Sequence, residues 1–375
     1  MTATKPATPR VCTRCVMDTS DANIGFDAAG VCHHCHVYDA SVRAHVRTDD
    51  AAKAARDELV AEIKREGAGK RYDCIIGISG GVDSTYVAYA VRKLLGLRPL
   101  AVHLDNGWDS ELAVKNIEHV LTKLEIELVT EVLDWDEFRD LQLAFLRAST
   151  PDSEIPTDHA IVSVLYQQAR RHKVRYIIGG CNVRTESHLP PSWSRGHSDW
   201  RYIRSLQKAF GTRPLATFPH RGMFDLVRDA RSIRWIDILN DLDYRKVDAL
   251  RLLGDELGWQ YYGGKHYESI YTRFYQGYIL PRKFGFDKRK MHLSSLVCSG
   301  EVTRDAALAE LTKPPYPEEL QASDREYVVK KLGITDADFD GIMRAAPRKF
   351  EDYPSYENSS FVRFARRVRA RLRPR

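Results

Sequence analysis

The residues best suited to chemistry form one short run, Ser79, Gly80, Gly81, Val82, Asp83 and Ser84. An apolar segment at 72–78 predicts a strand before this run, and the pattern from Thr85 predicts a helix after it. Two glycines permit a tight turn, and backbone N–H groups at a helix start attract anions. We therefore predict a turn that binds a phosphate or a metal. A capped turn that binds nothing is the alternative.

The run lacks the Gly-Lys-Ser/Thr ending of a Walker loop. It resembles instead the SGGxDS signature of the PP-loop ATP pyrophosphatases, which cleave ATP to AMP and pyrophosphate. This resemblance implies that the chain binds ATP and Mg²⁺. All six residues from Ser79 to Ser84 would then surround the phosphates.

Four cysteines follow the spacing of a zinc ribbon, C-x2-C, sixteen residues, C-x2-C: Cys12, Cys15, Cys32 and Cys35. Each C-x2-C turn presents two thiolates, and two turns complete a tetrahedral Zn²⁺ site. Because four thiolates close such a site, we expect the zinc to be structural. Disulfides are the alternative, but the odd total of seven cysteines argues against a framework made only of disulfides.

Strand-like runs at 72–78, 99–104, 127–132 and 174–178 alternate with helical patterns. This alternation predicts an α/β fold with a doubly wound parallel sheet. Ligands in such sheets bind at the carboxyl ends of the strands. The predicted nucleotide-binding residues that follow these ends are His103, Asp105, Gly180, Asn182 and Glu186. Of the carboxylates, Asp83 and Glu186 are best placed for Mg²⁺, while Asp105 could belong to a simple Asn-Gly turn.

A second charged group lies in the C-terminal region, where helical patterns replace the strands. Lys265, Lys288 and Lys290 could neutralise the phosphates of ATP or of a nucleotide sugar. His266 and Glu268 suit proton transfer. We predict a catalytic group of Asp83, Lys265, His266 and Glu268. A charged helix face that is only solvated is the alternative.

The composition is that of an ordinary globular protein, with a formal net charge of +6. The chain shows neither an apolar run of the roughly 18 residues that a membrane span needs nor an apolar signal region, so we expect a cytoplasmic protein. The expected domains are a zinc ribbon at 1–40, a helical linker at 41–70, a PP-loop domain at 71–222 and a mainly helical substrate-binding domain at 223–375. Seven arginines at 361–375 make a basic tail of open role.

Several further motifs narrow the resemblance. They are CTRCVMDTS at 12–20, GVC at 30–32, GKHYES at 264–269, FDKRK at 286–290 and HLSSLVCSGE at 292–301. Together with the Ser79–Ser84 loop, these motifs are similar to those of the N-acetyl sugar amidotransferases. These enzymes act in the biosynthesis of bacterial surface polysaccharides, such as the O-antigen of lipopolysaccharide. The similarity runs from about residue 11 to about residue 345. It implies a HUP-like (adenine nucleotide alpha hydrolase-like) PP-loop domain between the ribbon and the helical region.

This resemblance also implies a reaction. The acetamido oxygen of a nucleotide-activated sugar would attack the α-phosphate of ATP and release pyrophosphate. Ammonia would then displace AMP from the adenylated imidate and leave an acetamidino group. Phosphate binding and positioning would supply most of the catalysis, because no strong protein nucleophile is needed.

The sequence offers no convincing source of ammonia. An N-terminal nucleophile is not indicated, because Thr2 follows the methionine and no glutaminase-like domain comes after it. Neither Cys181 nor Cys298 lies in a complete G-x-C-x-G motif. We therefore expect a separate glutaminase subunit, as the family is paired with one.

A tRNA-thiolating PP-loop enzyme with a zinc ribbon is the alternative function. The basic tail and the cysteines outside the ribbon, Cys74, Cys181 and Cys298, would support it. These three lie over a hundred residues apart from one to the next, whereas thiolation enzymes place reactive cysteines close together. We therefore expect no nucleic-acid partner.

Overall fold

One sheet of five parallel strands lies at the centre of this computed structural model, in the order β3-β2-β1-β4-β5. The strands are β1 (Cys74–Gly77), β2 (Pro99–Asp105), β3 (Glu127–Val132), β4 (Tyr176–Gly179) and β5 (Arg234–Asp237). The structure describes residues 9–264 and 267–359. The predicted site residues Lys265 and His266 and the basic tail lie outside these ranges.

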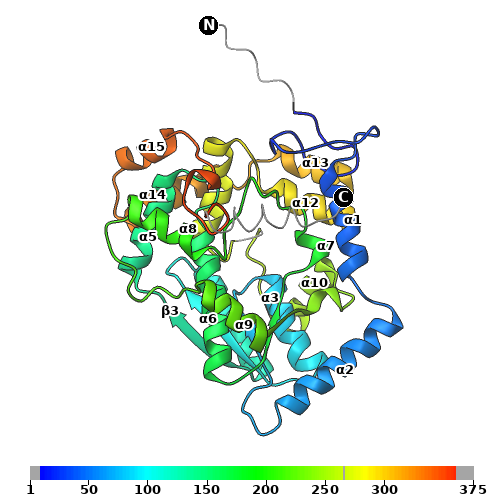
Figure 1. Cartoon of the computed structure of the whole chain (residues 1–375). Coiled ribbons are helices and arrows are strands. Elements are labelled where there is room, and N and C mark those ends of the chain that lie inside the picture. The colour runs from blue at the N-terminus through cyan, green and yellow to red at the C-terminus, as the bar shows by residue number, and fades with distance from the viewer. Residues whose placement is uncertain (1–8, 265–266, 360–375) are drawn as a thin grey trace, which may run out of the picture.

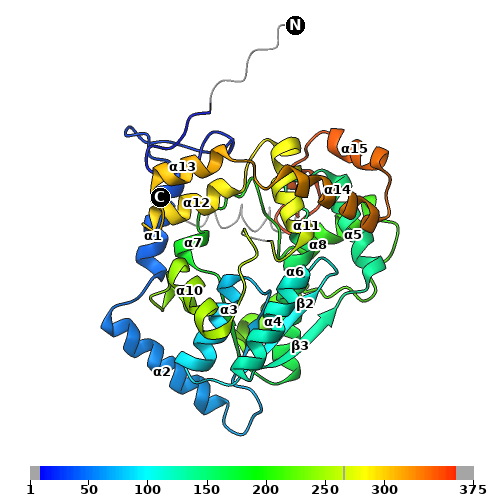
Figure 2. The same cartoon turned by 180° about the vertical axis from the view of Figure 1, so that it is seen from behind.

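Each central strand is apolar on both faces, as a sheet covered on both sides requires. Ile75 and Ile177 belong to one hydrophobic core, whereas their neighbours Ile76 and Ile178 belong to the other. Helices cover both sides of the sheet (Figures 1 and 2). The connecting helices are α3 (Val82–Tyr89) with its π-helical continuation Ala90–Leu94, α4 (Glu111–Leu124), α5 (Trp135–Ala148) and α6 (Ile155–Arg171). The predicted doubly wound α/β fold is therefore confirmed.

The strand order reverses direction between β1 and β4. From β1 the chain builds outward through β2 to β3, then returns through α5 and α6 to place β4 on the other side of β1. The crevice beyond the carboxyl ends at such a reversal is the usual ligand site of this fold class. The Ser79–Ser84 loop follows β1, and Gly180 follows β4, so both predicted segments lie at the reversal.

The sheet extends beyond the domain boundary expected at residue 222. β5 pairs with β4 in parallel, from Tyr176 opposite Arg234 to Gly179 opposite Asp237. The α/β part therefore includes a strand from the region that the sequence predicted to be mainly helical. β5 is only four residues long and carries Arg234 and Asp237, which hides its apolar pattern. The helices around it are α7 (Val183–Glu186), α8 (Trp200–Phe210), α9 (Met223–Ser232), the 3-10 turn Ile238–Asn240 and α10 (Lys246–Leu257).

The expected linker helix is divided in two. α1 (His33–His45) begins inside the second cysteine pair, and α2 (Asp50–Glu66) begins after Asp49, whose side chain accepts a 2.8 Å hydrogen bond from Ala52 N. Val60 and Ile63 of α2 are buried in the core on one face of the sheet. The linker is therefore packed on the α/β part along this helix.

The C-terminal part is mainly helical, as predicted. It contains α11 (Ile270–Phe274) with its π-helical continuation Tyr275–Phe284, α12 (Arg289–Cys298), α13 (Arg304–Thr312), α14 (Glu318–Leu332), α15 (Asp336–Arg344) and a 3-10 turn Phe350–Asp352. In both views α12 and α13 lie beside α1, while α14 and α15 lie at the other end of this part (Figures 1 and 2). Among the described helices, none is long and apolar enough to cross a membrane.

Candidate functional site

The Ser79–Ser84 loop forms the predicted turn between β1 and α3. Gly80 has φ +79°, and a Cβ atom there would lie 3.0 Å from the carbonyl oxygen of Ala113, so both the backbone and the space require glycine. Gly81 has an extended backbone (φ −69°) and caps α3. Ser84 Oγ accepts from Ser79 N at 3.2 Å and donates to Gly81 O at 3.1 Å. These bonds hold the turn at the positive end of the α3 dipole.

Asp83, in the first turn of α3, is held by a residue that the sequence did not indicate. Tyr244, which precedes α10, donates its hydroxyl hydrogen to Asp83 Oδ1. Burial and the adjacent Asp83 carboxylate raise the pKa of Tyr244 far above its usual value. The phenol therefore stays protonated and remains the donor to the Asp83 carboxylate.

The segment after β4 packs directly on α3. A Cβ atom at Gly180 would lie 3.4 Å from the backbone carbon and oxygen of Asp83. Asn182 is buried and caps α7, because its Oδ1 accepts from Thr185 N at 2.9 Å. Its amide nitrogen has no hydrogen-bond partner within the part of the chain that the structure describes. A buried donor of this kind beside the loop fits a polar ligand.

Carboxylates gather around this crevice. Cys181 is solvent-exposed as a residue. Desolvation of its thiol and the charges of Glu186, Asp237, Asp158 and Asp83 raise the thiol pKa to about 12. Glu186 also helps to raise the pKa of Asp237, after burial. Asp83, Glu186 and Asp237 therefore all lie near enough to Cys181 to act on its charge, and their oxygens are donors of the type that Mg²⁺ prefers.

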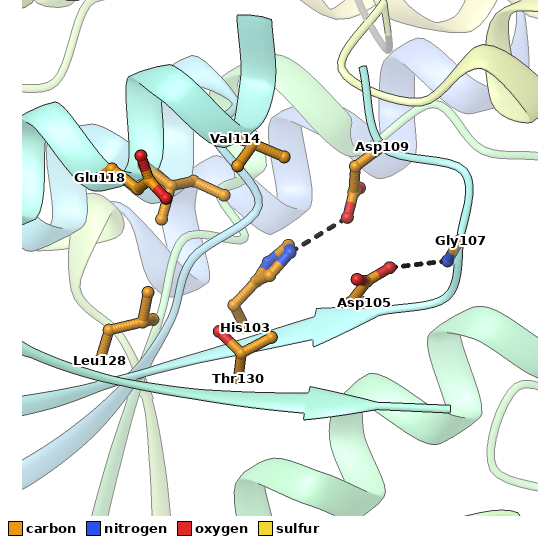
Figure 3. A pocket seen from close by; sticks show the side chains of 9 residues that line it. His103, Asp105, Gly107, Asp109, Val114, Glu118, Leu128 and Thr130 are labelled. Atoms are coloured by element: carbon orange, nitrogen blue, oxygen red, sulfur yellow. Dashed lines mark hydrogen bonds and ion pairs between the residues drawn. The ribbon is translucent and has the colours of Figure 1, made fainter. Parts of the chain in front are cut away.

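The end of β2 opens a separate cavity of about 310 Å³ (Figure 3). His103 bonds through Nδ1 to Ile78 O at 2.9 Å and faces Asp109 through Nε2 at 3.0 Å. Burial alone would lower the pKa of His103, but Asp109 outweighs it and the pKa is raised. Asp105 accepts from Gly107 N at 2.8 Å and also lines the cavity. The Asn-Gly turn is thus present at the mouth of the cavity, and the predicted contact of Asp105 with nucleotide stays a prediction.

Of the predicted catalytic residues in the C-terminal region, Glu268 lies within the part of the chain that the structure describes. Its side chain approaches the Ser79–Ser84 loop. Its Oε1 atom would lie 3.7 Å from a Cβ atom at Gly81, and the Tyr262 hydroxyl would lie at 3.5 Å. Burial, followed by the charges of Glu268 and Asp83, raises the pKa of Tyr262. The backbone fixes this approach, because Ser110 N donates to Glu268 O at 2.8 Å.

Lys288 and Lys290 already face carboxylates. Lys288 lies 3.6 Å from Glu154. Burial would lower its pKa, but Glu154 and the nearby Asp152 raise it. Lys290 pairs with Asp18 of the N-terminal segment at 2.5 Å. Both charges are balanced within the fold, and their predicted contact with nucleotide stays a prediction.

The four ribbon cysteines converge on one point. All are fully buried, and their Sγ atoms lie within 4.8 Å of one another. The measured pairs are 3.6 Å (Cys15–Cys32), 3.7 Å (Cys32–Cys35) and 3.9 Å (Cys12–Cys35). A Zn–S bond of about 2.3 Å gives a tetrahedral edge of about 3.8 Å, so the thiolates fit one zinc ion. Cys12 Sγ also accepts from the backbone N–H groups of Arg14, Cys15 and Cys32 at 3.2–3.4 Å.

Two family models match the chain. Residues 268–369 match "LPS biosynthesis protein WbpG-like, C-terminal domain", and residues 52–143 match "NAD synthase". The chain is a PP-loop protein with a WbpG-like C-terminal domain. The resemblance predicted from the motifs is therefore confirmed.

The chain is also similar to individual curated proteins. An uncharacterized protein of Methanocaldococcus jannaschii is 24% identical over 272 residues, which cover 70% of this chain and 80% of the relative. A GMP synthase of Aeropyrum pernix is 27% identical over 54% of this chain, and one of Chlorobium chlorochromatii is 32% identical over 23%. The chain spans only 34% and 16% of these two synthases.

Solved structures similar to the chain include two synthetases. NMN synthetase from Francisella tularensis is 18% identical and covers 56% of this chain and 73% of its own, with a TM-score of 0.31. NH3-dependent NAD synthetase from Campylobacter jejuni is 14% identical and covers 55% and 93%, with a TM-score of 0.28.

The WbpG-like domain begins at the loop. Its first matched residue is Glu268, and the next residues pair with the segment after β2 through the Asp109–Ser269 bridge. The PP-loop part and the start of the WbpG-like domain therefore meet beside the Ser79–Ser84 loop. Together the two matches support an ATP-utilising, amidotransferase-like enzyme of the C–N ligase type.

Proposed function

We propose that the chain is an AMP-forming amidotransferase that converts an acetamido group of a nucleotide-activated sugar to an acetamidino group in surface-polysaccharide biosynthesis. The observation that carries the proposal is the close approach of Glu268, the first matched residue of the WbpG-like domain, to Gly81 in the Ser79–Ser84 loop. A sugar held by the WbpG-like domain would thereby meet ATP held by the loop.

Three features support ATP in the crevice. The loop offers backbone N–H groups at the start of α3, and Asn182 offers a buried amide without a partner among the described residues. The cavity beside His103 and Asp105 measures about 310 Å³, at the lower end of the range for small-molecule sites. We assign the phosphates to the loop and the nucleoside to this cavity.

The acidic group beside the loop fits Mg²⁺. Asp83 and Glu186 would hold the ion, and Asp237 lies close enough to influence the same groups. When bound, Mg²⁺ would neutralise charge on the phosphates. The hydrogen bond from Tyr244 keeps Asp83 oriented for this role.

The reaction needs positioning more than a protein nucleophile. The amide oxygen forms a bond to the α-phosphorus while the bond to pyrophosphate breaks, and ammonia then replaces AMP at the imidate carbon. Glu268 brings a carboxylate of the WbpG-like domain close to the Ser79–Ser84 loop. We assign it proton transfer to or from the nitrogen of the attacking ammonia.

Ammonia would come from a separate glutaminase subunit. Cys181 does not suit glutamine hydrolysis, because its raised pKa of about 12 keeps the thiol protonated at neutral pH. Cys298 lies against the cysteine cluster at 3.8 Å from Cys35. Activity with ammonium salts but not with glutamine, restored by the partner subunit, would support this source. Equal activity of the isolated chain with glutamine would contradict it.

The geometry gives less support to tRNA thiolation. Cys74 is buried at the start of β1, whereas Cys181 follows the end of β4, so the two lie at opposite ends of a parallel sheet. Cys298 belongs to the cysteine cluster. These three cysteines therefore do not form a shared reactive group.

Mass spectrometry tests the proposal. A nucleotide diacetamido sugar incubated with the chain, ATP, Mg²⁺ and ammonium should exchange one oxygen for NH, with equal amounts of AMP and pyrophosphate. ADP formation, or AMP release without a change in sugar mass, would contradict the proposal.

A further inference from the structure

A fifth cysteine and a histidine lie against the four-cysteine cluster. Cys298, the last residue of α12, places its Sγ atom 3.8 Å from Cys35 Sγ and 3.7 Å from His188 Nε2. His188 follows α7 and is fully buried. The three ligand atoms lie within 4.8 Å of one another. The sequence spacing gave no sign of this group, because the three residues lie far apart in the chain.

These separations match the edges of a metal tetrahedron. Zn–S bonds of about 2.3 Å and Zn–N bonds of about 2.0–2.1 Å imply S···S edges of about 3.8 Å and S···N edges of about 3.6 Å. The observed values are 3.8 Å between Cys35 and Cys298 and 3.7 Å between Cys298 and His188. One ion can therefore contact all three atoms with little movement.

The hydrogen bonds of His188 prepare Nε2 as a ligand. Ser295 Oγ donates its only hydrogen to Met291 O at 3.1 Å, and it lies 3.0 Å from His188 Nδ1. With that hydrogen given to Met291 O, Nδ1 can carry a proton and donate it to Ser295 Oγ. The neutral ring then presents the Nε2 lone pair to the thiols, and a metal-binding histidine is oriented in this way by its other nitrogen.

We propose that Cys35, His188 and Cys298 form a second metal site, which takes a divalent ion of the zinc type. Cys35 would bridge this ion and the zinc of the four-cysteine site. Cys298 would lose its thiol proton to solvent when the metal binds, as thiolate ligands do. Three protein ligands leave the fourth position of a tetrahedron open, and partly exposed Cys298 lies on the side that solvent reaches.

The second ion would join three parts of the fold. Cys35 belongs to the N-terminal segment, His188 follows the reversal of the sheet, and Cys298 belongs to the WbpG-like domain. Other contacts already hold these parts together. Arg304 donates to Cys12 O at 2.8 Å, and Val16 N donates to Ser294 Oγ at 3.2 Å. The metal would add coordination bonds to a junction that hydrogen bonds and the Lys290–Asp18 ion pair already hold.

Zinc stoichiometry tests the site without reference to activity. The whole chain, loaded with excess Zn²⁺ and freed of unbound metal, should hold two equivalents, whereas Cys298→Ser and His188→Gln should each hold one. Cys181→Ser removes a cysteine outside the cluster and should keep two. One equivalent in the unaltered chain, or two in both ligand variants, would overturn the proposal.

A titration of the unaltered, metal-free chain with Co²⁺ covers the case in which the variants do not fold. Thiolate-to-cobalt charge-transfer absorption should grow up to two equivalents, because each ion has thiolate ligands. Saturation at one equivalent would mean that Cys298 and His188 only cover the first site by hydrogen bonding, and the second site would be rejected.

Discussion

The Tyr244 hydroxyl donates a hydrogen bond to Asp83 Oδ1 and so connects the segment before α10 to the first turn of α3. Tyr244 is buried, and its ring centroid lies 5.1 Å from that of Tyr86, which belongs to α3 like Asp83. The carboxylate of Asp83 is thus held both by the helix start and by a phenol from a distant part of the chain. This contact fixes the acidic group beside the loop.

Replacement of Asp83 by alanine should abolish AMP release. A preorganised charged group at a phosphoryl site contributes about 100-fold or more to the rate. Tyr244→Phe keeps the ring and removes only the hydrogen bond, so its AMP release should fall by roughly 10-fold, the equivalent of about 1.4 kcal/mol. Rates of AMP and pyrophosphate formation measure both effects. Zinc content should be unchanged in both variants, and unchanged turnover of Asp83→Ala would remove this residue from the site.

Gly80→Ala should destabilise the fold and stop ATP cleavage. At φ +79° an alanine costs about 1–2 kcal/mol, and its Cβ would also lie 3.0 Å from Ala113 O in α4. Gly69→Ala is a matched control, because Gly69 has φ +76° but open space around it. Thermal unfolding should therefore show a larger loss for Gly80→Ala. Equal losses would mean that the contact with α4 contributes nothing.

The sheet and most of the crevice were predictable because they follow local patterns. The four predicted strands correspond to β1 to β4 within two residues at each end, and Gly180 after β4 lies beside Asp83 after β1. β5 was missed, because four residues that include two charges carry little periodic signal.

The partners that hold the site were not predictable. Tyr244 contacts Asp83 across 161 positions in sequence, and Cys298 contacts Cys35 across 263. Neither residue has a spacing or motif that marks its partner, because each contact arises only when segments far apart in the chain pack together. Lys290 was predicted from its charge to bind phosphate. In the structure that charge pairs with Asp18, which the sequence did not indicate as its partner.

Zinc removal should loosen the N-terminal segment and leave the sheet intact. The backbone N–H groups of Arg14, Cys15 and Cys32 donate to Cys12 Sγ, and such bonds strengthen when the sulfur is a metal-bound thiolate. Hydrogen exchange with a chelator should therefore accelerate at these amides, while Ile76 in β1 stays protected. Cys12→Ser should show the same pattern without chelator. Unchanged exchange at the N-terminal amides would contradict a structural metal.

The His103–Asp109 pair should stabilise the protein most at mildly acidic pH. Asp109 and, more weakly, Asp105 raise the pKa of His103 in the folded state above its unfolded value of about 6.5. A base with a raised pKa adds stability that is fully present below the unfolded pKa and is lost as pH rises through the folded pKa. The free energy of unfolding of the unaltered chain should therefore exceed that of Asp109→Asn more at about pH 6 than at about pH 8.5. Chemical denaturation at both pH values measures this difference.

Glu118→Gln removes another carboxylate from the same cavity and serves as the control, because His103 does not pair with it. A gap for Asp109→Asn that is equal at both pH values would show that His103 is not charged by this pair.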